Sequence, residues 1–201
     1  MYPPNRSHFP IGTVPVHITY RLFGSVPRAE KKRIATGPGN KTATAGSLMR
    51  EELAVDSYLH RFSTGPMHLA HEGIRQLVLD SCLYLQAEGT LVLYAACVMS
   101  NHVHVIVGAR QNGQPLPIGP LMNRHKRHTA RGANRILGTT GNPFWETNYY
   151  DRTVWGTQFP RVMRYVLNNP VKAGLVATWQ DHQGTYVAPR FQAEYGQRQV
   201  G

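Results

Sequence analysis

Three segments of the chain have the apolar, β-branched character of β-strands. The first, residues 17–23, is followed by Gly24, which marks its end. The second and third, residues 91–99 and 102–108, are separated only by Ser100-Asn101. This spacing predicts a hairpin of two adjacent strands joined by a two-residue turn.

Four other segments have the apolar spacing of helices, and we predict helices over residues 48–62, 68–88, 121–137 and about 158–169. The clearest is the second, in which the following apolar residues share one face: Ile74, Leu77, Val78, Cys82 and Leu85. The last should end near Asn169, because Pro170 disfavours helical geometry in the residue before it.

Polar or Gly- and Pro-rich stretches connect these elements. We expect a loose N-terminal tail over residues 1–13, a basic surface loop or arm over 28–47, and a loose C-terminal tail from 189. We expect about residues 14–182 to form the core of a single domain, from which the 28–47 segment projects. Strands interleaved with helices, including a hairpin, predict an α+β fold in which helices pack on an antiparallel sheet.

The charge of the chain points to an anionic partner. The 201 residues include 22 Lys and Arg against 11 Asp and Glu, which gives a net charge of +11 at pH 7. Nucleic acid is the first candidate because phosphate contacts dominate its affinity for proteins. No apolar run is long enough for a membrane span, and Cys82 and Cys97 lie in apolar surroundings typical of reduced thiols. We therefore expect a cytoplasmic protein that binds nucleic acid and no membrane.

Two histidines on the third predicted strand are candidate metal ligands. Alternate side chains of a strand share a face, so His102 and His104 should project together while Val103, Val105 and Val107 point the other way. Two neutral imidazoles side by side make half of a metal site. The spacing is common, however, and taken alone it favours a surface strand that carries two histidines over a metal site.

Tyr165 and Asn169 are four residues apart, so on one helix they lie on the same face about one turn from each other. A helix packed beside the histidine strand would bring the amide oxygen of Asn169 and the hydroxyl of Tyr165 to the metal. The alternative is a helix that ends in an Asn-Asn-Pro turn beside a half-buried core tyrosine.

Two motifs together resemble those of the single-tyrosine transposases, and in particular the REP-associated tyrosine transposases. They are residues 98–104 (VMSNHVH) and 165–176 (YVLNNPVKAGLV). The basic helix and the aromatic stretch of residues 144–152 also follow that family in content and order. The resemblance extends over roughly residues 14–179. It departs from the family at Ser100, where a proline is common, and at Asn169, where insertion-sequence members often have Gln.

This resemblance implies a ferredoxin-like α+β fold with the His-x-His pair on a central strand. It also implies cleavage of single-stranded DNA near a hairpin through a covalent 5′-phosphotyrosine, in a nucleoid-associated bacterial protein. The nucleophile would be Tyr165, and the ligands of a divalent metal, Mg²⁺ or Mn²⁺, would be His102, His104 and Asn169. Whether the protein acts as a monomer or a homodimer is left open.

The basic helix and the aromatic stretch are the predicted DNA-binding elements. We expect phosphate contacts and base stacking from Arg124, Lys126, Arg127, Arg131, Trp145, Tyr149, Tyr150 and Arg152. The aromatic residues have alternatives: Trp145 could pack in the core, and Tyr149 and Tyr150 are rival nucleophiles. On the same helix His125 and His128 are three apart, which fits a solvated helix face better than a second metal site.

Two further functions compete with a DNA-cutting enzyme. One is a domesticated protein that binds hairpin DNA without cleaving it. The other is a zinc-stabilised RNA-binding module, which is disfavoured because two histidines without cysteine partners make a poor structural zinc site.

Overall fold

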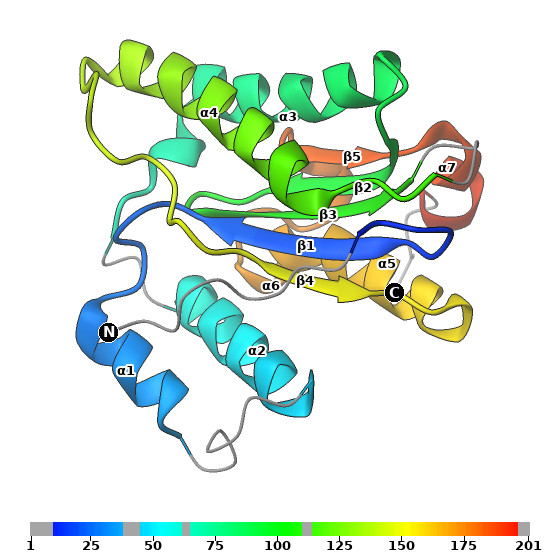
Figure 1. The fold of residues 1–201 in the computed structure, drawn as a ribbon, viewed down its shortest axis with the longest axis horizontal. Helices are drawn as coiled ribbons and strands as arrows, with labels where there is room; N and C mark the ends of the chain where they lie inside the picture. The colour runs from blue at the N-terminus through cyan, green and yellow to red at the C-terminus, as the bar shows by residue number, and fades with distance from the viewer. Residues whose placement is uncertain (1–9, 38–44, 62–64, 110–113, 197–201) are drawn as a thin grey trace.

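A five-stranded antiparallel sheet forms the centre of the molecule (Figure 1). The structure is a computed structural model that describes residues 10–37, 45–61, 65–109 and 114–196. The strand order is β4-β1-β3-β2-β5, which places β3 in the middle. The strands are β1 (Val16–Arg21), β2 (Val92–Val98), β3 (His102–Gly108), β4 (Tyr150–Thr153) and β5 (Thr185–Val187). The predicted α+β fold, with the two histidines on a central strand, is confirmed.

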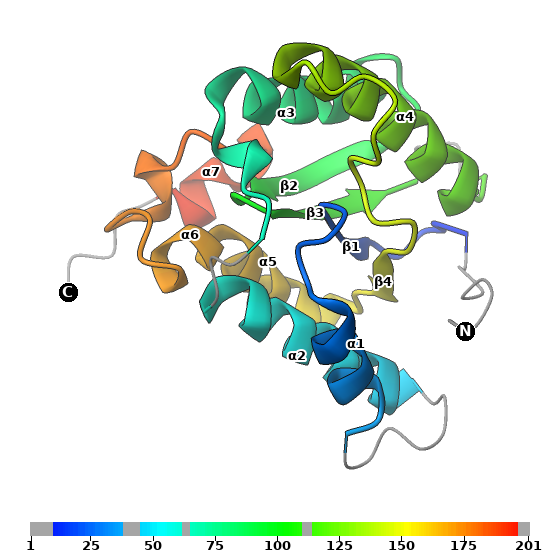
Figure 2. The same cartoon turned by 90° about the vertical axis from the view of Figure 1, so that its left-hand side faces the viewer.

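Helices cover both faces of the sheet (Figures 1 and 2). Helices α3 (Glu72–Ala87) and α4 (Ile118–Leu137) pack side by side on one face. The opposite face is covered by α2 (Ala45–Arg61), α5 (Phe159–Leu167) and α6 (Asn169–Lys172). Two shorter helices, α1 (Arg28–Ala35) and α7 (Pro189–Tyr195), and three 3₁₀ turns complete the fold, the turns spanning His68–Ala70, Gly156–Gln158 and Trp179–Asp181. None of the helices in the described ranges is long and apolar enough to cross a bilayer.

The alternation of side chains along β3 divides the core in two. Val103, Val105 and Val107 belong to the larger apolar cluster, which includes residues of α3 and α4. Ile106 belongs to the smaller cluster, which includes residues of α5. His102, His104 and Ile106 occupy alternate positions of β3 and therefore share one face of the sheet. The two histidines thus face the side that carries α2 and α5.

The predicted β2–β3 hairpin is present, with Ser100 and Asn101 at its turn. The Met99 N–H donates a hydrogen bond to the His102 carbonyl at 2.9 Å, which closes the turn. The Asn101 side chain donates to the Leu59 carbonyl at 3.3 Å, so the turn is tied to helix α2.

The expectation of a long surface loop over residues 28–47 was wrong in part. Arg28–Ala35 is a helix and α2 begins at Ala45; residues 38–44 lie outside the described chain. Tertiary packing explains the helix, because Ile34 is buried against Val55 and Leu59 of α2. The polar composition of this segment gave no indication of the contact, because only one residue of the short helix is apolar and buried.

Both predicted tails are more ordered than expected. In the N-terminal tail, Ile11 is fully buried and pairs with Leu116 in an isolated β-bridge, whereas residues 1–9 lie outside the described ranges. At the other end, α7 forms and its Tyr195 is 7% exposed and packs in the smaller core. These contacts join segments that are distant in sequence, so the local pattern does not indicate them.

Candidate active site

Three buried side chains from two elements converge beneath helix α2. The Nε2 atom of His104 lies 3.0 Å from Oδ1 of Asp56, and Nε2 of His102 lies 3.4 Å from the same oxygen. All three residues are less than 5% exposed. Asp56 comes from α2, whereas both histidines come from β3.

The surrounding side chains fix the orientation of both imidazoles. Nδ1 of His102 is 2.6 Å from Oδ1 of Asn101, in the hairpin turn. Nδ1 of His104 is 3.1 Å from the Thr19 hydroxyl and 3.2 Å from Nε2 of His17, both on β1. With Nδ1 engaged on both rings, each presents Nε2 to Asp56, which is the way metal-binding histidines are usually held.

A second layer of α2 residues supports this arrangement. The Thr19 hydroxyl donates to Oε1 of Glu52 at 3.1 Å, and the same carboxylate oxygen lies 3.5 Å from His17. One turn beyond Asp56, Nδ1 of His60 lies 3.6 Å from Oδ2 of Asp56. Glu52, Asp56 and His60 recur every four residues, so one face of α2 carries all three polar groups towards the sheet.

The atoms that face one another at the centre of this cluster fit a divalent cation. One ligand atom from each of Asp56, His102 and His104 lies within 4.8 Å of the others. Oδ1 of Asp56 and both Nε2 atoms are buried, and in the part of the chain that the structure describes the contacts between them lack hydrogen-bond geometry. Buried polar atoms need partners, and a bound cation would satisfy all three at once. A carboxylate and two imidazoles suit Mn²⁺ and related divalent ions.

Protonation in the cluster also suits a cation. Burial lowers the pKa of His102, which favours the neutral imidazole needed for metal ligation. Burial alone would raise the pKa of Asp56, but the neighbouring imidazoles of His104 and His102 outweigh it and lower this pKa well below its usual range. Asp56 is therefore a carboxylate at neutral pH.

The structure brings Tyr165 of α5 to the same carboxylate. Its hydroxyl donates a short hydrogen bond to Oδ2 of Asp56, and its ring centroid lies 5.6 Å from that of His104. Nζ of Lys172 lies 4.6 Å from the centroid of the Tyr165 ring. Burial first, and then the charge and hydrogen bond of Asp56, raise the pKa of the Tyr165 hydroxyl, so it is protonated at neutral pH.

Asn169 lies at the start of α6 rather than on the same helix as Tyr165. The prediction of one continuous helix over 158–169 is thus adjusted: α5 ends at Leu167, and Pro170 occupies the first turn of α6. Asn169 is fully buried, and its Nδ2 donates to the Tyr165 carbonyl at 2.8 Å. Among the described residues its Oδ1 has no hydrogen-bond partner, and its side chain lies near His60, whose pKa is lowered by burial.

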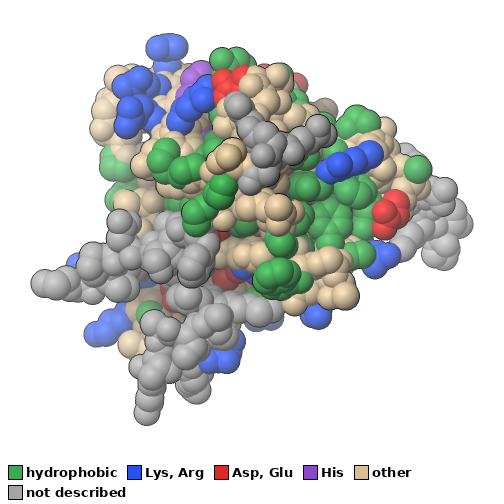
Figure 3. Space-filling view, turned by 45° about the vertical axis from the view of Figure 1, so that its right-hand side comes forward, with side chains coloured by type: hydrophobic (Ala, Val, Ile, Leu, Met, Phe, Trp, Pro, Cys, Tyr) green, Lys and Arg blue, Asp and Glu red, His purple; other side chains and the backbone are tan. Residues whose placement is uncertain are grey.

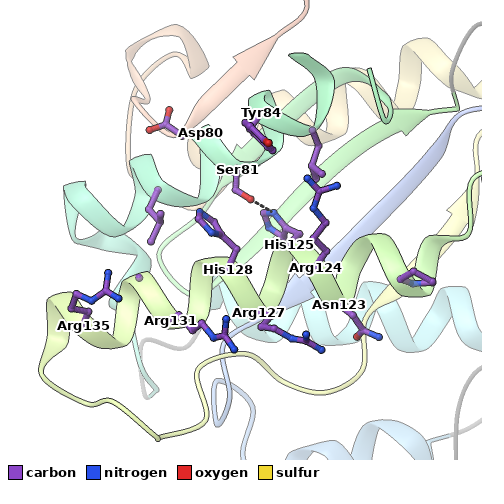
Figure 4. A pocket seen from close by; sticks show the side chains of 14 residues that line it. Asp80, Ser81, Tyr84, Asn123, Arg124, His125, Arg127, His128, Arg131 and Arg135 are labelled. Atoms are coloured by element: carbon purple, nitrogen blue, oxygen red, sulfur yellow. Dashed lines mark hydrogen bonds between the residues drawn. The ribbon is translucent and has the colours of Figure 1, made fainter. Parts of the chain in front are cut away.

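The predicted basic helix, α4, lines a groove with α3 on the opposite face of the sheet (Figure 4). The groove has a volume of about 1100 Å³. Its basic side chains follow α4 and are Arg124, Arg127, His128, Arg131 and Arg135. Arg127 and Arg131 are exposed, whereas Arg124 forms a two-pronged ion pair with Glu88 at 2.6 and 2.7 Å.

The other predicted DNA contacts lie outside this groove. Lys126 donates to the backbone carbonyls of Glu146 and Thr147, and burial lowers its pKa to about 8. Arg152 lies on β4 opposite His17, and its charge acts on Glu52 and on Tyr165, which places it on the side of the site rather than of the groove.

The aromatic stretch packs in the core, which corrects the expectation that its rings stack on bases. Trp145, Tyr149 and Tyr150 are 8, 6 and 8% exposed. The Trp145 indole donates to the Thr129 hydroxyl at 2.9 Å, and the Tyr150 hydroxyl donates to Glu51 at 3.0 Å. Their ring faces are covered by protein and are not available to a base.

His125 also differs from the expected solvated helix face. It is 3% exposed, and its two ring nitrogens lie 2.7 Å from the Tyr20 hydroxyl and 2.9 Å from the Ser81 hydroxyl. Figure 4 shows Ser81 and His125 facing each other between α3 and α4. His125 is a hydrogen-bonded core residue, whereas His128 is exposed.

Asp56 is the site residue that the sequence reasoning missed. The helix over residues 48–62 was predicted, but no chemistry was assigned to it. The available signal was the four-residue spacing of Glu52, Asp56 and His60, which puts three titratable side chains on one helix face.

Comparison with known proteins identifies the family. Residues 68–169, half of the chain, match the family model described as "Transposase IS200 like". The chain therefore belongs to the IS200-like transposase family, a family of DNA-processing proteins. A comparison with curated proteins finds no match.

Two solved structures are similar to this chain. One is a REP-associated tyrosine transposase bound to a REP hairpin, with 12% sequence identity, a TM-score of 0.54, and coverage of 96% of this chain and 86% of that chain. The other is a putative transposase from Deinococcus radiodurans, with 15% identity, a TM-score of 0.38, and coverage of 82% and 97%. At this identity the first likeness supports the shared fold.

Proposed function

We propose that this protein cuts and rejoins single-stranded DNA beside hairpins, with Tyr165 as the nucleophile and a 5′-phosphotyrosine as the covalent intermediate. The observation that carries the proposal is the position of the Tyr165 hydroxyl, which contacts the carboxylate of Asp56 at the His102–His104 pair. A nucleophile beside a divalent-cation site is the arrangement that transfer of a phosphodiester requires.

The proposed reaction exchanges one phosphate ester for another. The Tyr165 oxygen bonds to phosphorus, the bond to the 3′ oxygen breaks, and the hydroxyl proton of Tyr165 ends on that oxygen as a free 3′-hydroxyl. Mg²⁺ or Mn²⁺ held by His102, His104 and Asn169 would supply positive charge to a non-bridging phosphate oxygen. Because the phosphotyrosine is itself an ester, a 3′-hydroxyl can reverse the reaction and rejoin strands without ATP.

The groove between α3 and α4 is the proposed site for the backbone of the hairpin. Arg127 and Arg131 are exposed along it and separated by one helical turn, which suits successive phosphate contacts. On the face drawn in Figure 3, Lys and Arg side chains gather at the upper left and acidic side chains are sparse. The sheet separates this groove from Tyr165, so a single-stranded extension would have to pass around its edge to reach the site.

A denaturing gel tests the proposed chemistry. Labelled single-stranded hairpins from the DNA that flanks the gene are incubated with the protein and Mn²⁺ or Mg²⁺. We expect a labelled band at protein mass that Tyr165→Phe abolishes, while this variant still binds the hairpin. An adduct that survives in Tyr165→Phe would reject the nucleophile. Tight binding without an adduct in either metal would favour the domesticated hairpin-binding protein instead.

A further inference from the structure

Helix α2 lies outside the part of the chain that matches the family model. The match begins at residue 68, whereas α2 ends at Arg61. Even so, α2 lies against the face of the sheet that carries the histidine pair (Figure 2), and its Asp56 contacts His104.

The two oxygens of Asp56 face different groups. Oδ1 lies 3.0 and 3.4 Å from the Nε2 atoms of His104 and His102, and Oδ2 accepts the hydrogen bond of the Tyr165 hydroxyl. A single carboxylate thus touches both the candidate metal ligands and the candidate nucleophile. Its side chain is 6% exposed, so neither contact is an incidental surface pairing.

We infer that Asp56 is a ligand of the divalent-cation site through Oδ1 and positions the Tyr165 hydroxyl through Oδ2, so that helix α2 is a functional part of the active site. The inference rests on the proposed metal site, to which it adds one ligand and one helix. Asp56 would add a negatively charged ligand to the proposed ligands His102, His104 and Asn169, which are imidazole and amide groups.

The chemistry of the buried groups supports this role. A buried carboxylate is unfavourable unless a positive group compensates it. The described neighbours of Oδ1 are the Nε2 atoms of the two imidazoles, at 3.0 and 3.4 Å. A divalent cation between the three side chains compensates the carboxylate and engages both Nε2 atoms, and hard divalent ions prefer a carboxylate ligand.

The second acidic residue on this face of α2 has a different place. Glu52 accepts a hydrogen bond from Thr19 and lies beside His17, one layer behind His104. It therefore supports the orientation of His104, whereas Asp56 faces the Nε2 atoms themselves. The distinction predicts that the two carboxylates contribute unequally to metal affinity.

Mn²⁺ binding to the full-length protein, measured by titration calorimetry and electron paramagnetic resonance without DNA, tests the inference. We expect Asp56→Asn, which keeps the side-chain shape, to weaken Mn²⁺ affinity at least about tenfold, and Asp56→Glu to restore part of it. Glu51→Gln is the matched control: it removes one carboxylate from the same helix at a side chain that contacts Tyr150, and should keep wild-type affinity.

The histidine variants separate this inference from the proposed function. If His102→Ala abolishes Mn²⁺ binding but Asp56→Asn leaves it unchanged, Asp56 is not a ligand and the inference is overturned while the metal site stands. If His102→Ala also leaves Mn²⁺ binding unchanged, the metal site itself is rejected.

Hydrogen–deuterium exchange of α2 provides a readout that does not depend on activity. If Asp56 ligates the cation, Mn²⁺ should slow amide exchange in α2 of the wild type, because the ligand ties the helix to β3. The same addition should have no effect on α2 in Asp56→Asn. Equal protection in both proteins would show that the helix responds to the metal without Asp56 and would overturn the inference.

Discussion

At the scale of single residues, the chain uses its histidines in two different ways on the two faces of the sheet. His102 and His104 present to Asp56 Nε2 atoms that make no hydrogen bond among the described residues, whereas His125 has both ring nitrogens within hydrogen-bond distance of hydroxyl groups. The first pair is oriented as candidate ligands of a cation, whereas His125 is a neutral, hydrogen-bonded residue of the core.

The buried state of His125 predicts a pH dependence of stability. Burial, followed by the charges of His128 and Lys126, lowers the pKa of His125 from 6.5 to about 3. Between these values the unfolded chain binds a proton that the folded protein does not, so stability falls as the pH falls from 6.5 towards 3 and is fully present above 6.5. One such group contributes a slope of about 1.4 kcal/mol per pH unit.

Urea unfolding between pH 4 and 6 measures this slope. We expect His125→Gln, which retains a polar side chain without the titration, to show a shallower dependence of the free energy of unfolding on pH. His71→Gln changes an exposed histidine that does not act on the pKa of His125, and it should keep the wild-type slope. Parallel slopes for wild type and His125→Gln would contradict the prediction.

At the scale of elements, short strands and helices at the edges of the sheet depend on tertiary contacts. β5 pairs with β2 through three residues, and the Val98 N–H donates to the Gly184 carbonyl at 2.8 Å just before β5 begins. A side chain on Gly184 would meet the Val98 carbonyl oxygen at 2.6 Å, which is backbone and cannot move aside cheaply.

We therefore expect Gly184→Ala to lower the free energy of unfolding by about 1–3 kcal/mol, because the new Cβ pushes β5 away from β2. Gly119→Ala is the matched control, since no described atom lies within 4 Å of a Cβ added in the first turn of α4. It should be neutral or stabilising, as alanine favours helix over glycine by up to about 1 kcal/mol. Urea unfolding measures the free energy of unfolding of both variants. Equal values for Gly184→Ala and Gly119→Ala would refute the steric argument.

At the scale of the whole molecule, the sheet separates two candidate functional regions. The candidate active site lies between the sheet and α2 and α5, and the basic groove lies between α3 and α4 on the other face (Figures 1 and 4). Binding and cleavage should therefore respond to different substitutions.

The double variant Arg127→Ala/Arg131→Ala tests this separation. Loss of two phosphate contacts should weaken hairpin binding and reduce the slope of log affinity against log salt concentration by roughly 1.4 to 1.8. Arg28→Ala/Lys32→Ala removes the same charge from exposed positions on α1 and should change the slope much less. Fluorescence anisotropy over a salt series measures both, and identical slopes for the two variants would place the DNA elsewhere.

The sequence by itself determined the fold class, the β2–β3 hairpin, the shared face of His102 and His104, and the main helices, because each depends on local periodicity and turn residues. The roles of Tyr165 and Asn169 beside this pair, inferred from their four-residue spacing and from a resemblance between motifs, stay a prediction. Only the tertiary structure showed that Asp56 meets the histidines, 46 residues before His102 in the chain. It likewise decided that Trp145 lies in the core, because contacts between distant segments leave no local pattern.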